Sequence, residues 1–152
     1  MYPYFQEIIN YLYLGNSKSV EYSKFDMIVN CTKENQVPFP THYITKCIRI
    51  PIKDDPSEYN NLLQILLNTD VLEQIHNHIT NKKQVLVHCV MGQQRSCAVV
   101  ACYLIKYRNL TTEESINFII SKRPIAFFGS VNFLQTIICF FQKSIGKKEA
   151  IN

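Results

Sequence analysis

The chain has 152 residues, of which 47% are hydrophobic, and a formal net charge of +4 at pH 7. This length and apolar content suit one compact domain with a real core, and no linker-like or charge-rich stretch divides residues 1–152. The lysines are scattered instead of forming a basic block, so the charge indicates neither a nucleic-acid surface nor a membrane surface. A substrate that carries phosphate is compatible with it.

The N-terminal stretch lacks a basic segment followed by an apolar run, and no segment is long and apolar enough to span a bilayer. We therefore expect a cytoplasmic protein that does not bind membranes. In a chain without an export signal, cysteines inside apolar segments are expected to be reduced thiols. The chain has six: Cys31, Cys47, Cys89, Cys97, Cys102 and Cys139.

Four short runs are rich in β-branched or aromatic residues and are bounded by Gly, Pro, Asn or charged residues. They predict strands of one sheet over residues 11–15, 27–31, 46–52 and 84–89. The apolar residues of 57–79 recur at intervals of three and four residues, which predicts an amphipathic helix. This helix would cross from one strand to a parallel neighbouring strand.

The second half of the chain predicts helices. Residues 96–107 are apolar on nearly all sides, so this helix should be buried. Thr111 and Glu114 form a capping-box pattern at the start of the next helix, which ends before Pro124, and a last helix is expected over roughly 131–143. The pattern predicts a single α/β domain with a central, mostly parallel twisted sheet of about four or five strands flanked by helices.

The stretch VLVHCVMGQQRSCAVVACYLI, residues 85–105, combines a strand, a tight loop and a helix. In such a unit, the N–H groups of the loop and of the helix N-terminus converge on one point and bind an anion there. The same groups would stabilise the thiolate of Cys89, so we expect it to be ionised and nucleophilic.

Three further residues of this loop fit an anion site. Arg95, in the first helical turn, can hold two phosphoryl oxygens with its planar fork. Gly92 permits the positive φ or close approach that a phosphate-wrapping turn requires. Ser96 can give its hydroxyl to the Cys89 sulfur, which would help the thiolate to depart when a phosphocysteine is hydrolysed.

Two plainer interpretations compete with this one. A cysteine at a strand end is usually a small buried hydrophobe, and a His-Cys pair can ligate zinc. No second Cys or His lies at ligand spacing, so zinc is disfavoured, and the combined pattern favours a catalytic phosphate loop. His88 is expected to support the loop by hydrogen bonding and not to act as a general base.

Phosphoryl transfer to sulfur also needs a proton for the leaving oxygen, which a carboxylic acid usually donates. Only Asp54 and Asp55 of the four aspartates lie in a loop after a predicted strand and upstream of Cys89. In a parallel sheet this loop opens at the same edge as the cysteine loop, so one of the pair is the candidate acid. Asp55 precedes Pro56 and Ser57, and a turn at the helix entry is its expected position.

The run VHCVMGQQRS resembles the His-Cys-x5-Arg-Ser motif of the cysteine-dependent protein phosphatases. The surrounding segments LYLGN, IVNCTKE, IRIPIKDD and FLQTI resemble those of the small dual-specificity phosphatases, and in size and order the chain is similar to the compact poxviral members. The resemblance implies a protein tyrosine phosphatase-like fold, no metal and no cofactor. It also implies a viral protein that is a monomer or a homodimer.

The same resemblance assigns the site. It makes Cys89 the nucleophile, Arg95 the phosphate binder, Ser96 the thiolate stabiliser and Asp54 the general acid. The phosphate loop would comprise His88, Val90, Met91, Gly92, Gln93 and Gln94.

The implied activity is hydrolysis of phosphotyrosine, and of phosphoserine and phosphothreonine, in proteins through a phosphocysteine intermediate. Relatives that act on phosphoinositides place lysines inside the loop, and relatives that act on RNA 5′ ends carry Asn-Arg-Thr-Gly; this loop has neither. Those substrates stay open as alternatives, as does a pseudophosphatase that binds phosphoproteins without cleaving them.

Overall fold

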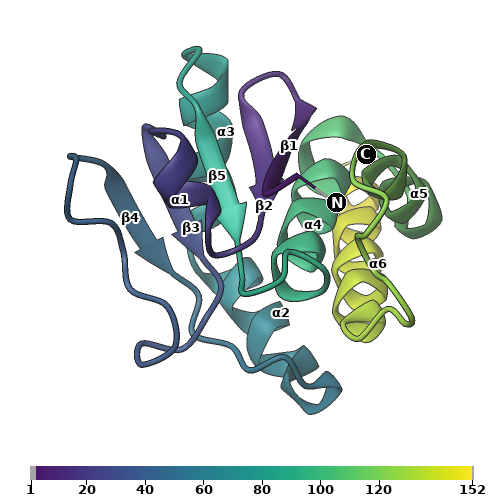
Figure 1. The fold of residues 1–152 in the computed structure, drawn as a ribbon. Helices are drawn as coiled ribbons and strands as arrows, with labels where there is room; N and C mark the ends of the chain where they lie inside the picture. The colour runs from purple at the N-terminus through teal and green to yellow at the C-terminus, as the bar shows by residue number, and fades with distance from the viewer. Residues whose placement is uncertain (1–2, 152) are drawn as a thin grey trace.

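A computed structural model describes residues 3–151, with side chains described as far as Gly146. Its centre is a five-stranded sheet of order β1-β2-β5-β3-β4, in which only the β1–β2 pair is antiparallel (Figure 1). The expected α/β class with a mostly parallel sheet is confirmed. The strands are β1 (Phe5–Ile9), β2 (Leu12–Gly15), β3 (Met27–Asn30), β4 (Lys46–Arg49) and β5 (Val85–His88).

The helices lie on the two faces of this sheet, most of them on one. The short α1 (Ser19–Tyr22) follows β2, whereas α4, α5 and α6 pack together beside the sheet (Figure 1). The remaining elements in chain order are the 3₁₀ turn η1 (Pro56–Glu58), α2 (Tyr59–Asn68), α3 (Val71–Thr80), α4 (Arg95–Arg108), α5 (Thr112–Lys122) and α6 (Leu134–Ile151).

The central strand β5 is apolar on both faces because both faces are covered. Val85 and Val87 belong to the large core that includes residues of α2 to α6, whereas Leu86 packs with Ile28 and Phe25 in a smaller cluster on the α1 side. Alternate residues of a strand point to opposite faces, so one short strand contributes to both layers. Its end, where the functional loop begins, is thereby fixed from two sides.

Several predicted elements agree closely with the structure. The helix expected over 96–107 is α4, and all of its residues from Arg95 to Ile105 are buried. The capping box at the start of α5 is present: Thr111 Oγ1 accepts from the Glu114 N–H at 3.1 Å, and Glu114 accepts from the Thr111 N–H at 2.9 Å. The last helix begins at Leu134, three residues later than its approximate predicted start.

The prediction of one crossover helix over 57–79 was wrong. Thr69 is extended (φ −117°, ψ 169°), and its hydroxyl donates to the Ile65 carbonyl at 2.6 Å, which ends α2. Asp70, placed inside that helix by the sequence pattern, instead precedes α3 and accepts a hydrogen bond from Gln74. The spacing of the apolar residues is unchanged across the break, because α2 and α3 both pack their apolar residues into the same core.

Two features of the sheet also differ from expectation. The strand β1 was not predicted; it pairs antiparallel with β2 through a tight turn in which Tyr11 has a φ of 72°. In addition, the crossover from β4 does not reach a neighbour: β5 lies two positions away, with β3 between them. This places β5 in the middle of the sheet.

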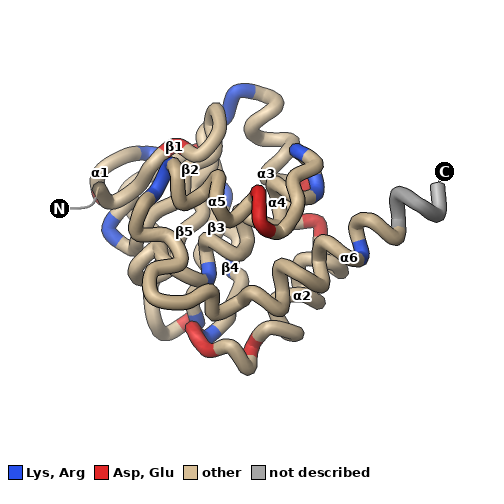
Figure 2. The backbone as a smooth tube through the Cα atoms, turned by 90° about the vertical axis from the view of Figure 1, so that its right-hand side faces the viewer, with Lys and Arg blue, Asp and Glu red and all other residues tan. Residues whose placement is uncertain are grey.

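Charge does not gather at one edge of the molecule. Figure 2 shows lysines and arginines spread along the tube, with acidic residues interspersed. Among the described residues, no helix combines the length and the hydropathy needed to cross a membrane.

Candidate active site

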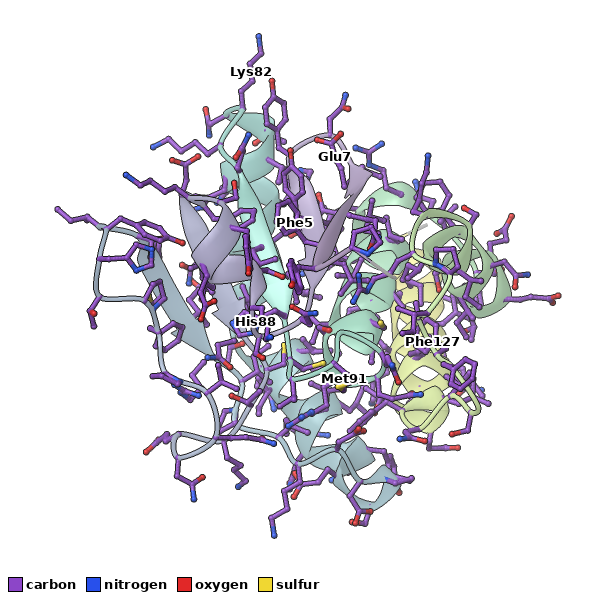
Figure 3. The ribbon with its side chains drawn as sticks, in the orientation of Figure 1. Phe5, Glu7, Lys82, His88, Met91 and Phe127 are labelled. Carbon is purple, nitrogen blue, oxygen red and sulfur yellow. The ribbon has the colours of Figure 1, made fainter. Side chains whose placement is uncertain are left out.

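The loop of residues 89–94 connects the C-terminal end of β5 to the first turn of α4. The start of the loop is tied to the segments that follow β3 and β2: the Cys31 N–H donates to the His88 carbonyl at 2.8 Å, and the Ser17 N–H donates to the Val90 carbonyl at 3.0 Å. Figure 3 shows His88 where β5 ends and Met91 on the loop beyond it, with Phe127 on the adjoining segment. The loop therefore lies where the sequence predicts it, at the edge of the sheet formed by the C-terminal ends of the parallel strands.

Cys89 lies at the base of the loop and is only 2% exposed. Its sulfur is 3.1 Å from Ser96 Oγ, and Ser96 is fully buried in the first turn of α4. This is the contact that the spacing of the two residues predicted. A buried hydroxyl next to the sulfur can donate to it when it is negatively charged.

Arg95 is also buried, at 4% exposure. Its Nη1 donates to the Ile52 carbonyl at 2.9 Å and to Gln36 Oε1 at 3.0 Å, whereas its Nε is buried and has no acceptor among the described residues. A buried donor without a partner is costly, and a bound anion would satisfy it.

A second arginine supports the loop by hydrogen bonds to its backbone, and this role was not predicted from the sequence. Arg123, 1% exposed, donates from Nε to the Gly92 carbonyl at 2.9 Å and from Nη2 to the Met91 carbonyl at 3.2 Å. Its Nη1 bonds the Pro3 carbonyl and Gln6 Oε1. Burial lowers the pKa of Arg123, yet an arginine remains a cation at neutral pH. With two loop carbonyls turned toward Arg123, the adjoining N–H groups can face the anion.

Gly92 has a φ of 66° and lies in a crowded place. A Cβ there would be 2.6 Å from the Gly15 carbonyl oxygen and 2.7 Å from Arg123 Nη2, distances that real Cβ atoms do not reach. Glycine is therefore required for two reasons, the backbone conformation and the close approach.

We expect Gly92→Ala to lose inorganic phosphate binding and to lower the free energy of unfolding by more than the roughly 1 kcal/mol of a left-handed alanine. Gly129→Ala is the matched control, because Gly129 has a φ of 82° and a Cβ there would have open space around it. Urea unfolding and calorimetric titration with phosphate would measure both effects. Equal losses in the two variants would contradict the crowding argument.

The two glutamines of the loop fix the segment between α5 and α6. Gln94 donates from Nε2 to the Ser130 carbonyl at 2.6 Å and accepts from the Asn132 N–H at 2.9 Å. The carbonyl of Gln93 accepts from the Phe127 N–H at 2.7 Å. The Gln94 side chain and the Gln93 carbonyl thus hold this segment in place, whereas Met91 is 59% exposed at the rim.

His88 is fully buried, and its Nδ1 is 3.1 Å from the Cys89 carbonyl oxygen. Burial lowers the pKa of His88 from 6.5 to about 4, a shift that the hydrogen bond to Cys89 opposes. The ring is therefore neutral at pH 7 and stays so through mild acid. This geometry fits a residue that supports the loop.

The two adjacent aspartates occupy different positions. Asp55 Oδ1 accepts from the Ser57 N–H at 2.9 Å and caps η1, and this bond lowers the pKa of Asp55. Asp54 is exposed, and its Oδ1 accepts from Asn132 Nδ2 at 3.1 Å. Because the Asn132 backbone is bonded to Gln94, a short chain of hydrogen bonds joins Asp54 to the cysteine loop. The structure thus places Asp55 at the expected helix entry and Asp54 beside the loop.

Two other thiols lie near Cys89 but are held protonated. Burial raises the pKa of Cys31 and of Cys97, and the Cys97 thiol donates to the Gly92 carbonyl at 3.4 Å. Among the side chains that the structure describes, as far as Gly146, no group of three or more His, Cys, Asp or Glu residues is arranged to hold a metal ion.

A groove of about 470 Å³ begins next to this site. It is lined by residues of 17–21 and of 36–42, and Gln36, which contacts Arg95, is one of its walls. Val37, Pro38 and Phe39 give it an apolar part, and Lys18, Glu21 and His42 add polar groups.

Comparison with solved structures gives the same architecture. Human DUSP28 superposes with a TM-score of 0.81 at 23% identity, covering 94% of this chain and 96% of that one. A mouse putative dual specificity phosphatase complexed with zinc tungstate gives a TM-score of 0.83 at 24% identity, covering 96% and 91%. At these identities the likeness establishes the fold.

Sequence comparison goes further. Residues 12–143 match the family model described as the dual specificity phosphatase catalytic domain. A putative tyrosine phosphatase 123R of Invertebrate iridescent virus 6 is 35% identical over 138 residues, 88% of this chain and 89% of the viral protein. The protein phosphatase Slingshot homolog of Xenopus laevis is 32% identical over 125 residues, 78% of this chain but only 17% of that much longer protein. The chain belongs to the dual specificity protein phosphatase family.

Proposed function

We propose that this protein phosphatase hydrolyses phosphotyrosine, and also phosphoserine and phosphothreonine, in cytoplasmic phosphoproteins through a phosphocysteine intermediate. The observation that carries the proposal is the cluster around the loop. A cysteine sulfur lies 3.1 Å from a buried hydroxyl, next to a buried arginine whose Nε has no partner in the part of the chain that the structure describes. Such a site presents a nucleophile at the place where it also binds an anion.

In the first step, the Cys89 thiolate attacks phosphorus and the bond from phosphorus to the ester oxygen breaks. The electron pair of that bond goes to the leaving oxygen, which takes a proton from Asp54. Arg95 and the loop N–H groups hold the three remaining phosphoryl oxygens as their charge rearranges. The product alcohol or phenol departs, and the phosphoryl group is left on sulfur.

In the second step, water attacks the phosphocysteine and gives a proton to Asp54, now a carboxylate. The phosphorus–sulfur bond breaks and its electron pair returns to Cys89. A hydrogen bond from Ser96 stabilises the departing thiolate, which makes it a better leaving group. Inorganic phosphate leaves, and the site regains its starting protonation.

Substrate class follows from the surroundings of the loop. Val90, Met91, Gln93 and Gln94 are uncharged, so the loop offers no cation for a second phosphate of an inositol lipid or of an RNA 5′ end. The adjoining groove has an apolar part that suits the polypeptide next to a phosphorylated side chain. A phosphoprotein is therefore favoured over the other two classes, and the intact Cys89, Arg95 and Asp54 argue against a binding-only protein.

A panel of substrates tests the proposal. We expect phosphate release from phosphotyrosyl peptides, slower release from phosphoseryl and phosphothreonyl peptides, and little from inositol phosphate head groups or RNA 5′-triphosphate. Tyrosine should be favoured because a long aromatic side chain reaches a buried sulfur more easily. Peptide binding without phosphate release would overturn catalysis, and a preference for RNA or inositol phosphates would overturn the substrate class.

A further inference from the structure

The guanidinium of Arg95 is held through one nitrogen. Nη1 carries two hydrogens, and both have acceptors: the Ile52 carbonyl at 2.9 Å and Gln36 Oε1 at 3.0 Å. Nε is buried, and no described residue accepts a hydrogen bond from it. A two-pronged contact with phosphate must therefore use the opposite edge, formed by Nε and Nη2. The two acceptors on Nη1 decide which edge is presented.

Of these two acceptors, one is a backbone carbonyl and the other is the side chain of Gln36. Gln36 lies 59 residues away from Arg95 in the sequence. Its segment is the β3–β4 loop, and hydrogen bonds from the ends of both strands hold it in place. Asn30 Nδ2 and Arg49 Nη2 both donate to the Val37 carbonyl, at 3.0 and 3.1 Å, and Arg49 Nη1 donates to the Lys33 carbonyl at 3.0 Å. The residues on either side of Gln36 are thus pinned to the ends of β3 and β4.

The structure also explains why an amide suits this position better than a carboxylate. An amide oxygen accepts the Nη1 hydrogen bond without neutralising the guanidinium. A carboxylate at the same distance would form an ion pair with Arg95 and repel a bound phosphate. Gln36 therefore orients the arginine and leaves its charge available to the substrate.

We propose that Gln36 is a positioning residue of the phosphatase reaction, which aims the Nε and Nη2 edge of Arg95 at the phosphoryl oxygens. This proposal rests on the proposed function, because it assigns a task within that site. It adds a residue outside the cysteine loop, on the segment that also forms a wall of the neighbouring groove.

The test compares three variants by calorimetric binding of inorganic phosphate, and by kcat and KM on a phosphotyrosyl peptide. Gln36→Glu should weaken phosphate binding about tenfold or more, and Gln36→Ala by about three- to tenfold, the effect of losing one hydrogen bond of ordinary strength. KM should rise in both variants, and kcat should fall because Arg95 tightens its contact in the transition state. Asn35→Asp is the matched control, since it adds the same charge to the adjacent exposed residue.

The outcomes separate the possibilities. Equal weakening by Gln36→Glu and Asn35→Asp would overturn the proposal, because the effect would then be one of charge at a distance. Phosphate affinity unchanged in Gln36→Ala, with urea unfolding confirming an intact fold, would also overturn it. Wild-type protein that binds phosphate but releases none from peptides would sink the proposed function, and the affinities would still decide the task of Gln36.

Discussion

Cys89→Ser should reduce phosphate release to less than about a thousandth of the wild-type rate, the order of effect seen when an intermediate-forming nucleophile is removed. The serine hydroxyl is a far poorer nucleophile than a thiolate, because it stays protonated at neutral pH. Phosphopeptide binding should persist, since the loop N–H groups and Arg95 are unchanged. Initial rates and calorimetric titration with the same phosphotyrosyl peptide measure the two properties.

Cys47→Ser is the control for this variant. Cys47 is exposed on β4, and its thiol donates to the Thr45 carbonyl at 3.7 Å, so its loss should leave turnover at the wild-type level. Turnover by Cys89→Ser close to that of the wild type would exclude the phosphocysteine mechanism.

Asp54→Asn should slow release from a phosphopeptide by roughly a hundred- to ten-thousandfold, the usual contribution of a general acid. The loss should be much smaller with an activated aryl phosphate, because a good leaving group departs without a proton. The variant should also lose the fall in rate at high pH that depends on the acid being protonated. Rates for both substrates across a pH series would show this.

Asp55→Asn is the control, because Asp55 is adjacent to Asp54 but caps η1. Asn caps a helix about as well as Asp, so the bond to the Ser57 N–H should persist and the pH profile should not change. An exchange of the two behaviours would shift the acid by one residue. If neither variant alters the pH profile, the acid lies outside the segment from Ile50 to Ser57.

The cysteine loop could be predicted from sequence because its chemistry is local. Cys89, Gly92, Arg95 and Ser96 lie within eight consecutive residues, between a strand and a helix that set their geometry. The capping box at Thr111 and the turn at Asp55 were predicted for the same reason, since each depends on bonds between residues two or three positions apart.

Features that depend on distant contacts could not be predicted in this way. In the sequence, Arg123 is a cation at the end of a predicted helix and Gln36 is a polar residue between two predicted strands. Neither position indicates that Arg123 contacts Gly92 or that Gln36 contacts Arg95. The strand β1 was missed because its FQEII sequence has a partly exposed pattern, and its pairing depends on a turn with positive φ at a tyrosine. Thr69 ends α2 but does not disturb the spacing of the apolar residues, so this spacing alone does not indicate the break.

The bonds of Arg123 bear on the order in which the protein matures. This side chain joins Pro3 and Gln6, from 120 and 117 residues upstream, to the carbonyls of Met91 and Gly92. Closing a loop of such separation costs more conformational entropy than closing a short one. During synthesis the cysteine loop leaves the ribosome before Arg123 does, so its final shape must wait for the second half of α5 and the segment after it. The newly made chain therefore lacks the complete support of its phosphate loop until Arg123 has left the ribosome.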